Sequence, residues 1–386
     1  MTGRGRICGP VGRKPLVLFV SFTNLREGGG AEHALLNIVR FAPYELVDVI
    51  VLQASRLDHE RLERAEVEAA TSKARVLTVN RLADSLSLFE RNPWIWGVVR
   101  FFLRPVAMTI ERKWTIRPIM QAIGEVSSIY LAQNDDISYF RDHRYAVYGS
   151  DLCWGWTQTT GYAKKLELKL IAAGLLWNRI DGFHLYPHHR NGLNTLRRPL
   201  SFTAPLGVDT TLFFPAPRRD DSVMRFLFVS RLEECKGVLT VIDAWQEAHC
   251  DGQAELHVAG TGSLERVVRQ RLPEGAIFHG ALSDMALAKL YRECDVFLFP
   301  TRCDSYGLVV LEAASSGLYI VASDNLRGIF DDLQSFGCLE YMSPDSHAIA
   351  MRIRHLLQNR ELRDRNRANI HNHIAENYDW RVVTAL

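Results

Sequence analysis

Short runs of apolar and β-branched residues alternate with segments of helical periodicity along the chain. Such runs are apolar on both faces, which is typical of parallel strands that helices cover on each side. The clearest runs are LVLFVSF (16–22), VDVIVL (47–52), RFLFVS (225–230), AELHVAG (254–260), DVFLFP (295–300) and LYIVAS (318–323). Strands and helices in alternation predict an α/β fold of doubly wound parallel sheets.

A proline-rich stretch divides the chain into two predicted domains. The length of 386 residues suits two domains of this class. Residues 197–219 contain four prolines, and a new strand is predicted from Arg225. We therefore place the boundary near residue 215. Open α/β sheets bind ligands beyond the carboxyl ends of their strands, so two facing sheets would form one cleft.

Charge and cysteine spacing exclude several classes of protein. The 46 basic and 44 acidic residues give a net charge of +2, so no general field attracts nucleic acid. The seven cysteines are odd in number and scattered, which indicates a reducing cytoplasm and no structural zinc. The run 16–22 is too short for the apolar core of a signal peptide. His184 and His188 are separated by a stretch containing Pro187, so we expect no metal.

Residues 295–323 form one predicted βαβ unit. A strand leads into a loop over residues 300–307, and a helix follows from Leu308. The loop would deliver Asp304 to the mouth of the cleft. The free N–H groups and the positive dipole end at the start of the helix would suit a diphosphate. Glu312 lies about a turn and a half into the helix, so it would reach the group attached to that phosphate.

These residues resemble a known family in their order along the chain. The spacing Asp304-x7-Glu312 resembles the E-x7-E signature of retaining glycosyltransferases of family 4, which have the GT-B fold. Three further stretches resemble family motifs, namely FVSRLEECKG (228–237) for the G-R-L-x-x-x-K-G segment, VAGTGSLERVV (258–268) for the G-x-G turn and GGGAEH (28–33) for the glycine loop. The resemblance is clear over residues 225–325 and patchy before residue 200.

The resemblance implies net-retaining transfer of a sugar from a nucleotide diphosphate donor to an acceptor hydroxyl, without a metal or other cofactor. UDP is favoured over GDP, and the acceptor stays open between a glycan and a lipid-linked molecule. The implied architecture is two Rossmann-like domains facing each other across a cleft. Residues 1–215 would bind the acceptor and residues 216–370 the donor. Residues 371–386 would form a C-terminal helix, and its return to the first domain is left open.

The resemblance also implies a role for each matching residue. Arg231 and Lys236 would hold the pyrophosphate, since two cations opposite a helix N-terminus neutralise a leaving nucleoside diphosphate. Glu312 would bind the ribose hydroxyls, and Asp304 would touch the donor sugar. The remaining donor-site candidates are Gly29, Gly30, Gly260, Thr261, Gly262, Ser305, Tyr306, Gly307 and Leu308.

Two departures from the family pattern concern the sugar and the acceptor. Asp304 stands where glutamate is commoner, and its shorter side chain makes the donor sugar harder to assign. Many members carry a histidine where this chain has Gly149, although the following Trp156 is retained. His143 and Asp151 are alternative substitutes for that histidine.

Residues 91–117 combine aromatic and basic side chains. They contain six basic residues against one acid, Glu111. Arginines, Gly97 and Pro105 interrupt the apolar stretch, so it is unsuited to crossing a bilayer. One interpretation places it on an anionic membrane surface, making the protein peripheral at the cytoplasmic face. The other is a core helix pair whose arginines extend to solvent.

Two other functions stay open beside the transferase. A sugar-nucleotide epimerase or another GT-B enzyme, such as a sugar phosphorylase, would keep the cleft and change the reaction. A degenerate protein would bind nucleotide sugar without turnover, as the missing histidine and Asp304 suggest.

Overall fold

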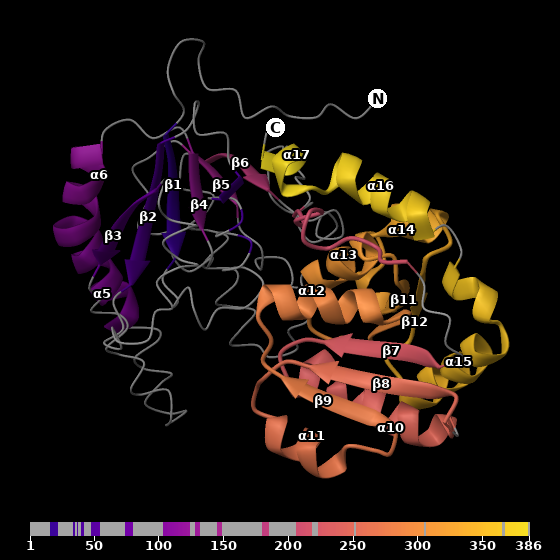
Figure 1. The fold of residues 1–386 in the computed structure, drawn as a ribbon. Helices are drawn as coiled ribbons and strands as arrows, with labels where there is room; N and C mark the ends of the chain where they lie inside the picture. Colours follow the sequence, from indigo (N-terminus) through magenta and orange to yellow (C-terminus); the bar gives the residue numbers. More distant parts are fainter. Residues whose placement is uncertain are drawn as a thin grey trace. The chain divides into compact units, whose positions relative to one another are not determined.

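The chain divides into two compact units. The computed structural model describes residues 16–21, 34, 37, 40–41, 48–54, 74–79, 103–123, 128–131, 145–148, 180–184, 206–217, 223–250, 252–304, 306–364 and 367–384. The first unit comprises Met1–Ala204 with Thr384–Leu386, and the second comprises Pro205–Val383 (Figure 1). The division therefore lies before Pro205 rather than near residue 215, because the segment after Pro205 pairs with the end of the second unit.

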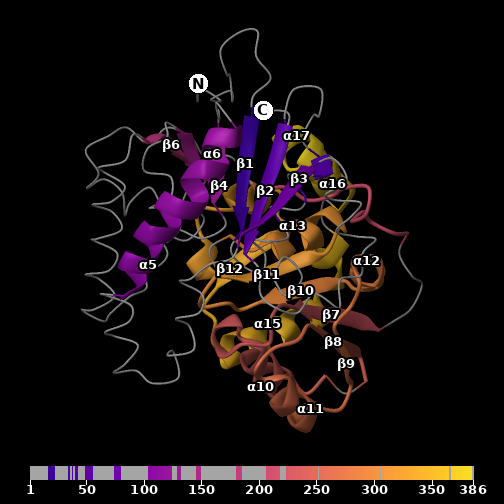
Figure 2. The same cartoon turned by 90° about the vertical axis from the view of Figure 1, so that its left-hand side faces the viewer.

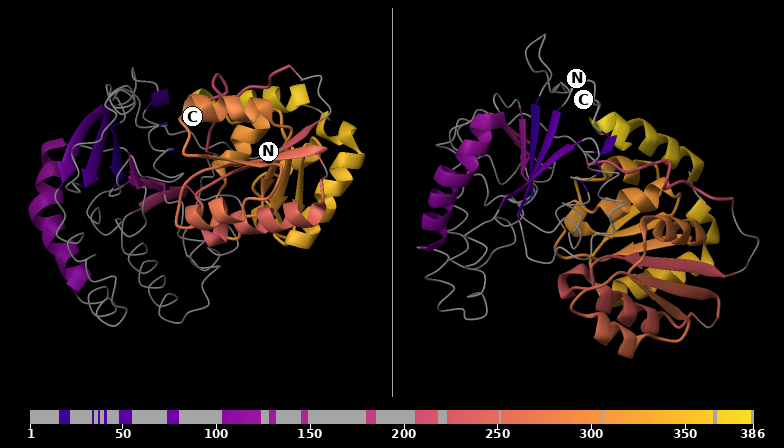
Figure 3. Two further views of the ribbon diagram at one scale, coloured as in Figure 1. Left: turned by 60° about the horizontal axis from the view of Figure 1, so that its bottom comes forward. Right: turned by 60° about the vertical axis from the view of Figure 1, so that its left-hand side comes forward.

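The first unit contains a six-stranded parallel sheet in the order β3-β2-β1-β4-β5-β6. Its strands are β1 Leu16–Ser21, β2 Asp48–Ala54, β3 Ala74–Val79, β4 Ser128–Leu131, β5 Tyr145–Tyr148 and β6 Ile180–His184. Three successive helices form one rod along this sheet, as Figures 2 and 3 show, and they are α5 Arg104–Glu111, the π-helix η4 Arg112–Ile116 and α6 Arg117–Ile123.

The second unit repeats this topology, with the strand order β12-β11-β10-β7-β8-β9, all parallel. Its strands are β7 Met224–Val229, β8 Ala254–Ala259, β9 Ala276–Gly280, β10 Val296–Phe299, β11 Tyr319–Ser323 and β12 Leu339–Met342. The strand order reverses between β7 and β10, and ligands of doubly wound sheets bind beyond the carboxyl ends of strands at such a switch point. The strands predicted from the apolar runs are confirmed.

Helices cover both faces of the second sheet. Figure 1 shows α12 Asp284–Glu293 and α13 Leu308–Ser315 on one face, and α10 Val238–Ala248, α11 Glu265–Arg271 and α15 Ser346–Gln358 on the other. Every residue of β10 and β11 is buried. Burying an aromatic or aliphatic side chain of this size contributes about 1.5–3 kcal/mol, which is why these runs are apolar on both faces. The packed sheet gives the loops at its carboxyl edge a rigid base.

The beginning and the end of the second unit form a clasp, which we define as residues 206–213 with 378–383. Val208 and Asp379 form a parallel bridge. The Val208 amide donates to the Tyr378 carbonyl at 2.8 Å, and the Trp380 amide donates to the Val208 carbonyl at 3.1 Å. Trp380 is 2% exposed.

The C-terminal segment differs from the single helix predicted over residues 371–386. It forms two helices, α16 Arg367–Asn377 and α17 Trp380–Thr384. The break between them carries Asp379, which pairs with Val208. The chain leaves helical geometry there because its backbone groups bond to the first strand of the clasp instead.

Candidate functional site

The segment after β7 is fastened to the loop after β10. The 3-10 helix η7 Glu234–Lys236 is followed by Gly237, which has a φ of +84°. A Cβ at Gly237 would lie 2.4 Å from the carbonyl oxygen of Pro300, so both the backbone conformation and the space require glycine. The Arg302 amide donates to the Cys235 carbonyl at 2.7 Å. These contacts bring together the chain segments that leave the two strands of the switch point.

Lys236 and Asp304 form an ion pair where these segments meet. The Lys236 Nζ donates to Asp304 Oδ2 at 2.7 Å and to the Cys303 carbonyl oxygen at 3.2 Å. The two side chains are only 9% and 17% exposed. The Tyr306 amide donates to the other oxygen of Asp304 at 3.2 Å. Water is thus largely excluded from the pair, and its charges interact more strongly than they would on an open surface.

The same loop ends at the N-terminus of α13. Gly307 is the N-cap residue with a φ of +86°, and Leu308 is the first helical residue. A Cβ at Gly307 would lie 3.2 Å from the Phe299 ring, which β10 holds in the core. The first amides of a helix have no intrahelical acceptors and carry the positive end of the dipole. This loop therefore carries an anion-attracting helix end, as well as Asp304.

Glu312 lies half-buried on α13, and its position depends on a tyrosine that the sequence pattern did not single out. Glu312 Oε2 accepts a hydrogen bond from the Tyr291 hydroxyl at 3.1 Å. Tyr291 belongs to α12, is fully buried and packs edge-on against Phe213 at 5.6 Å. Burial and the nearby Glu312 charge raise the pKa of Tyr291 well above its ordinary value, so its hydroxyl stays a donor. Nothing in the spacing of the two residues indicates this contact.

The turn after β8 packs backbone to backbone against the segment after β7. A Cβ at Gly260 would lie 1.9 Å from the Ser230 carbonyl oxygen, and one at Gly262 would lie 2.7 Å from the Leu232 amide. The Leu232 amide donates to the Thr261 carbonyl at 2.8 Å. The described contacts therefore require small residues here for packing between the two segments. The donor-site role of Gly260, Thr261 and Gly262, which the resemblance to the family's G-x-G turn implies, stays a prediction.

Arg231 lies on the same segment as Lys236 and is exposed. Its charge helps to lower the pKa of Glu233, although hydrogen bonds from Ser263 are the larger cause. The Ser263 hydroxyl and amide donate to Glu233 at 2.6 Å and 3.1 Å. Arg231 is thus placed beside the glycine turn, and the described contacts do not join it to the Lys236–Asp304 pair.

Five predicted site residues fall outside the described residues. They are Gly29, Gly30, His143, Asp151 and Ser305. Residues 91–102 of the aromatic and basic stretch and His188 fall outside them as well. The predictions made for these positions stay predictions.

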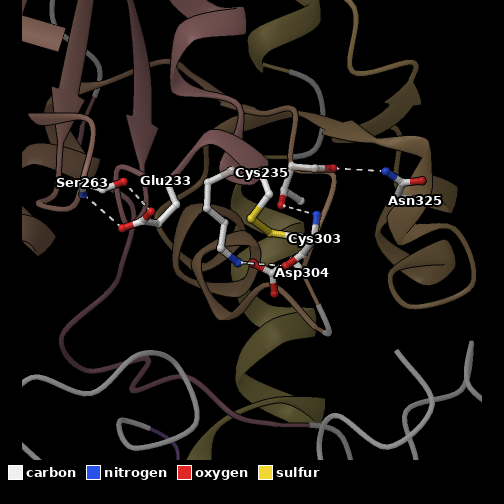
Figure 4. Close-up of a disulfide and its surroundings, with 8 residues drawn as sticks. Glu233, Cys235, Ser263, Cys303, Asp304 and Asn325 are labelled. Carbon is white, nitrogen blue, oxygen red and sulfur yellow. Dashed lines mark hydrogen bonds and ion pairs between the residues drawn. A yellow bond between two sulfur atoms is a disulfide. The ribbon is translucent and has the colours of Figure 1, made fainter. Parts of the chain in front are cut away.

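Cys235 and Cys303 form a disulfide between the two segments (Figure 4). The prediction of reduced cysteines is therefore wrong for this pair. The two residues are 68 positions apart, so their spacing gave no indication of a bond. One sequence feature was consistent with a bond between them. Cys235 directly precedes Lys236 and Cys303 directly precedes Asp304, and both following residues were predicted to lie in the same site. Cys250, Cys294 and Cys338 are buried and are not part of a disulfide.

Within the described ranges, no three His, Cys, Asp or Glu side chains gather as metal ligands. No helix in the part of the chain that the structure describes has the length and apolarity needed to cross a membrane.

The helix rod of the first unit exposes apolar side chains at helical spacing. Leu103, Val106, Ile110 and Trp114 are 49%, 56%, 46% and 71% exposed. Glu111, the acid within residues 103–123, is 4% exposed. Lys113 and Arg117 are exposed, so the charges that this described segment presents to solvent are basic. Ala107, Ile116 and Met120 on the same helices are buried, so one face packs in the core while the other is exposed. Both interpretations of residues 91–117 therefore stay predictions.

Comparison with solved structures identifies the fold. The structure of Anabaena HepE in complex with UDP and glucose superposes with a TM-score of 0.70 at 17% sequence identity, covering 96% of this chain and 97% of that one. Sucrose-phosphate synthase from Thermosynechococcus elongatus gives a TM-score of 0.72 at 15% identity, covering 96% of each chain. The fold is GT-B. At these identities, the likeness concerns the fold alone.

Sequence comparison finds a glycosyltransferase match that contains the donor-site candidates from Arg231 to Glu312 and not Gly29 or Gly30. Residues 224–359 match the protein-family model described as Glycosyl transferases group 1. The phosphatidyl-myo-inositol mannosyltransferase of Mycobacterium tuberculosis is 31% identical over 193 residues, which are 47% of this chain and 51% of that protein. Sulfoquinovosyl transferase SQD2 of Arabidopsis thaliana is 35% identical over 113 residues, 28% of this chain and 22% of that protein. The chain thus matches about half the length of its mycobacterial relative.

Proposed function

We propose that this chain is a retaining glycosyltransferase that moves a sugar from a UDP-sugar to an acceptor hydroxyl. The observation that carries the proposal is the ion pair between Lys236 and Asp304. It forms at the switch point, where the segment after β7 contacts the loop that leads into α13. A buried cation beside a helix N-terminus suits a leaving diphosphate. The presence of UDP in the complex of Anabaena HepE supports a uridine nucleotide for this chain also.

The proposed roles follow from the charges that develop during transfer. As the glycosidic bond to the donor breaks, negative charge grows on the departing diphosphate. Lys236, Arg231 and the first amides of α13 would stabilise that charge. The proposed reaction therefore needs no metal ion. Asp304 would accept hydrogen bonds from the donor sugar, and Glu312 would accept them from the ribose. The departing phosphate would take the acceptor proton on the same face, which gives retention of configuration.

A donor screen tests the proposal. Purified protein is incubated with UDP- and GDP-sugars and a panel of glycan and lipid acceptors, with a chelator present. We expect acceptor-dependent release of UDP, and NMR of the product should show the same anomeric configuration as the donor. Absence of transfer and of nucleotide release with every donor would contradict the proposal. Conversion of the donor without acceptor would indicate an epimerase, and binding without turnover would indicate a non-catalytic protein.

We further propose that the acceptor is lipid-linked and that the helix rod of the first unit lies on an anionic membrane surface. Four exposed apolar residues at spacings of three and four follow the rod, and Lys113 and Arg117 provide positive charge beside them. This combination suits an interfacial helix whose apolar face enters the headgroup region. The mycobacterial relative is a phosphatidyl-myo-inositol mannosyltransferase, which supports a phospholipid-linked acceptor for this chain also.

Sedimentation with vesicles is expected to show that the helix rod binds anionic membranes. Ile110→Ser with Trp114→Ser should reduce the bound fraction on phosphatidylglycerol vesicles at least about fivefold, because two exposed apolar side chains leave the interface. Raising the salt concentration to about 0.5 M should weaken wild-type binding, since added ions screen the basic residues. Met285→Ser is the matched control, because Met285 is 69% exposed on α12. Equal binding of the double variant and the wild type would exclude this surface.

A further inference from the structure

The disulfide links two chain segments next to the residues that form the buried ion pair. Cys235 precedes Lys236 on the segment after β7, and Cys303 precedes Asp304 on the loop after β10. Their Cα atoms are 5.5 Å apart. Figure 4 shows Asp304 beside the bonded sulfurs and Asn325 on the other side of the loop.

We infer that the Cys235–Cys303 disulfide positions Lys236 and Asp304 for the donor diphosphate, and that its reduction weakens donor binding. The inference rests on the proposed function for its binding consequence. Its structural part, that the bond restrains the ion pair, rests on the contacts alone. We assign neither cysteine a contact with the reacting groups. Both act as positioning residues for Lys236 and Asp304.

The contacts explain why the bond acts at this point of the loop. The Asn325 side-chain amide donates a hydrogen bond to the Thr301 carbonyl at 3.3 Å, and the Arg302 backbone amide donates one to the Cys235 carbonyl at 2.7 Å. The loop is anchored again at Tyr306, whose ring packs edge-on against Phe330 at 5.3 Å. The Arg302 guanidinium also donates to the Pro344 carbonyl at 2.8 Å. From Cys303 to Tyr306, the described contacts that other segments make before the Tyr306 anchor are the disulfide and the bonds from Lys236.

The side chain of Lys236 depends on this part of the loop. Both of its hydrogen-bond acceptors, the Cys303 carbonyl and Asp304 Oδ2, lie on the two consecutive residues that the disulfide restrains. A shift of the loop would therefore move both acceptors together and leave a largely buried ammonium without its partners. Such a charge is unfavourable, so the lysine would turn toward solvent.

The chemistry of opening is a thiol exchange that a dithiol reductant can drive. A thiolate of the dithiol attacks one sulfur, the bond between the two cysteines breaks, and the second thiol of the reagent closes its own disulfide. Two electrons pass from the dithiol to the pair, and each cysteine sulfur gains one proton. A small-molecule disulfide such as oxidised glutathione reverses the step. Both cysteines are partly exposed, whereas Cys250, Cys294 and Cys338 are buried.

Trace acetylation of lysines tests the structural part without any assumption about activity. Mass spectrometry would compare the labelling rate of Lys236 in the wild type, in Cys303→Ser and in the control Cys250→Ser. We expect at least a threefold rise at Lys236 in Cys303→Ser and none in Cys250→Ser. Lys289, which is 72% exposed, is the internal reference whose rate should not change. An unchanged rate at Lys236, or free Cys235 and Cys303 thiols in the purified protein, would overturn the inference.

Calorimetry with UDP tests the binding part. The Kd for UDP should rise about fivefold after treatment with dithiothreitol and in Cys303→Ser, and stay unchanged in Cys250→Ser. In transfer assays, the donor KM should rise while kcat changes less than twofold. If Lys236 becomes more reactive while the Kd stays the same, the disulfide positions the lysine and the proposed diphosphate role of Lys236 fails. If neither quantity changes, the positioning role fails.

Discussion

Replacing Lys236 with methionine is expected to lower kcat/KM for the donor by about 10²–10³, which is the usual loss when one preorganised donor to a developing anion is removed. Methionine keeps the length of the stem and removes the charge that Asp304 and the Cys303 carbonyl hold. Steady-state kinetics at several donor concentrations would give the value.

The same substitution leaves Asp304 without its cation, so stability must be separated from activity. We expect a loss of roughly 2 kcal/mol, below the 3–5 kcal/mol typical of a broken buried pair, because Asp304 keeps 17% of its surface exposed. The double variant Lys236→Met with Asp304→Asn removes both charges and should regain most of this stability. It should not regain activity. A Lys236→Met enzyme with more than a third of the wild-type kcat/KM would exclude a role in binding the leaving group.

Substituting Gly260 with alanine is expected to disrupt both the fold and the site. Its φ is +132°, and the new Cβ would lie 1.9 Å from the Ser230 carbonyl oxygen. Backbone cannot retreat as a flexible side chain can, so the turn after β8 and the segment after β7 must separate. We expect a loss of about 3 kcal/mol or more, which corresponds to a fall in Tm of roughly 6–12 °C for a domain of this size.

Gly252→Ala is the matched control for backbone strain. Gly252 has a φ of +74°, yet nothing lies within 4 Å of a Cβ built there. Its substitution should therefore cost only the strain of a left-handed residue, about 1 kcal/mol. Equal melting temperatures for the two variants would contradict the steric argument. UDP affinity should fall only in Gly260→Ala, since the displaced segment carries Arg231 and Lys236.

The fold was predictable because apolar runs report burial directly. A run such as VFLF in β10 has no polar face, and in a chain of alternating elements this indicates a central parallel strand. Lys236 and Asp304 were predicted separately, each from its position after a strand. Their contact depends on β7 and β10 being neighbours, which follows from the strand order and not from the local sequence.

The contacts that the sequence did not indicate are long-range and specific to side-chain geometry. The Tyr291 hydroxyl reaches Glu312 from another helix, and Cys235 reaches Cys303 across 68 positions. Periodicity indicates which face of a helix or strand is buried. It does not indicate which side chains on two buried faces contact each other. The division after residue 204 falls inside the proline-rich stretch 197–219, and its exact place depends on the pairing of Val208 with Asp379, which the composition did not indicate.

The clasp has a consequence for any excised donor domain. The region that matches the glycosyltransferase family covers residues 224–359, so it omits both sides of the bridge between Val208 and Asp379. A fragment cut to those limits would lose the anchored indole of Trp380 and would expose the apolar surface on which it rests. The part of this chain that can fold alone is therefore expected to extend beyond residues 224–359 at both ends, and it must contain both residues of the bridge.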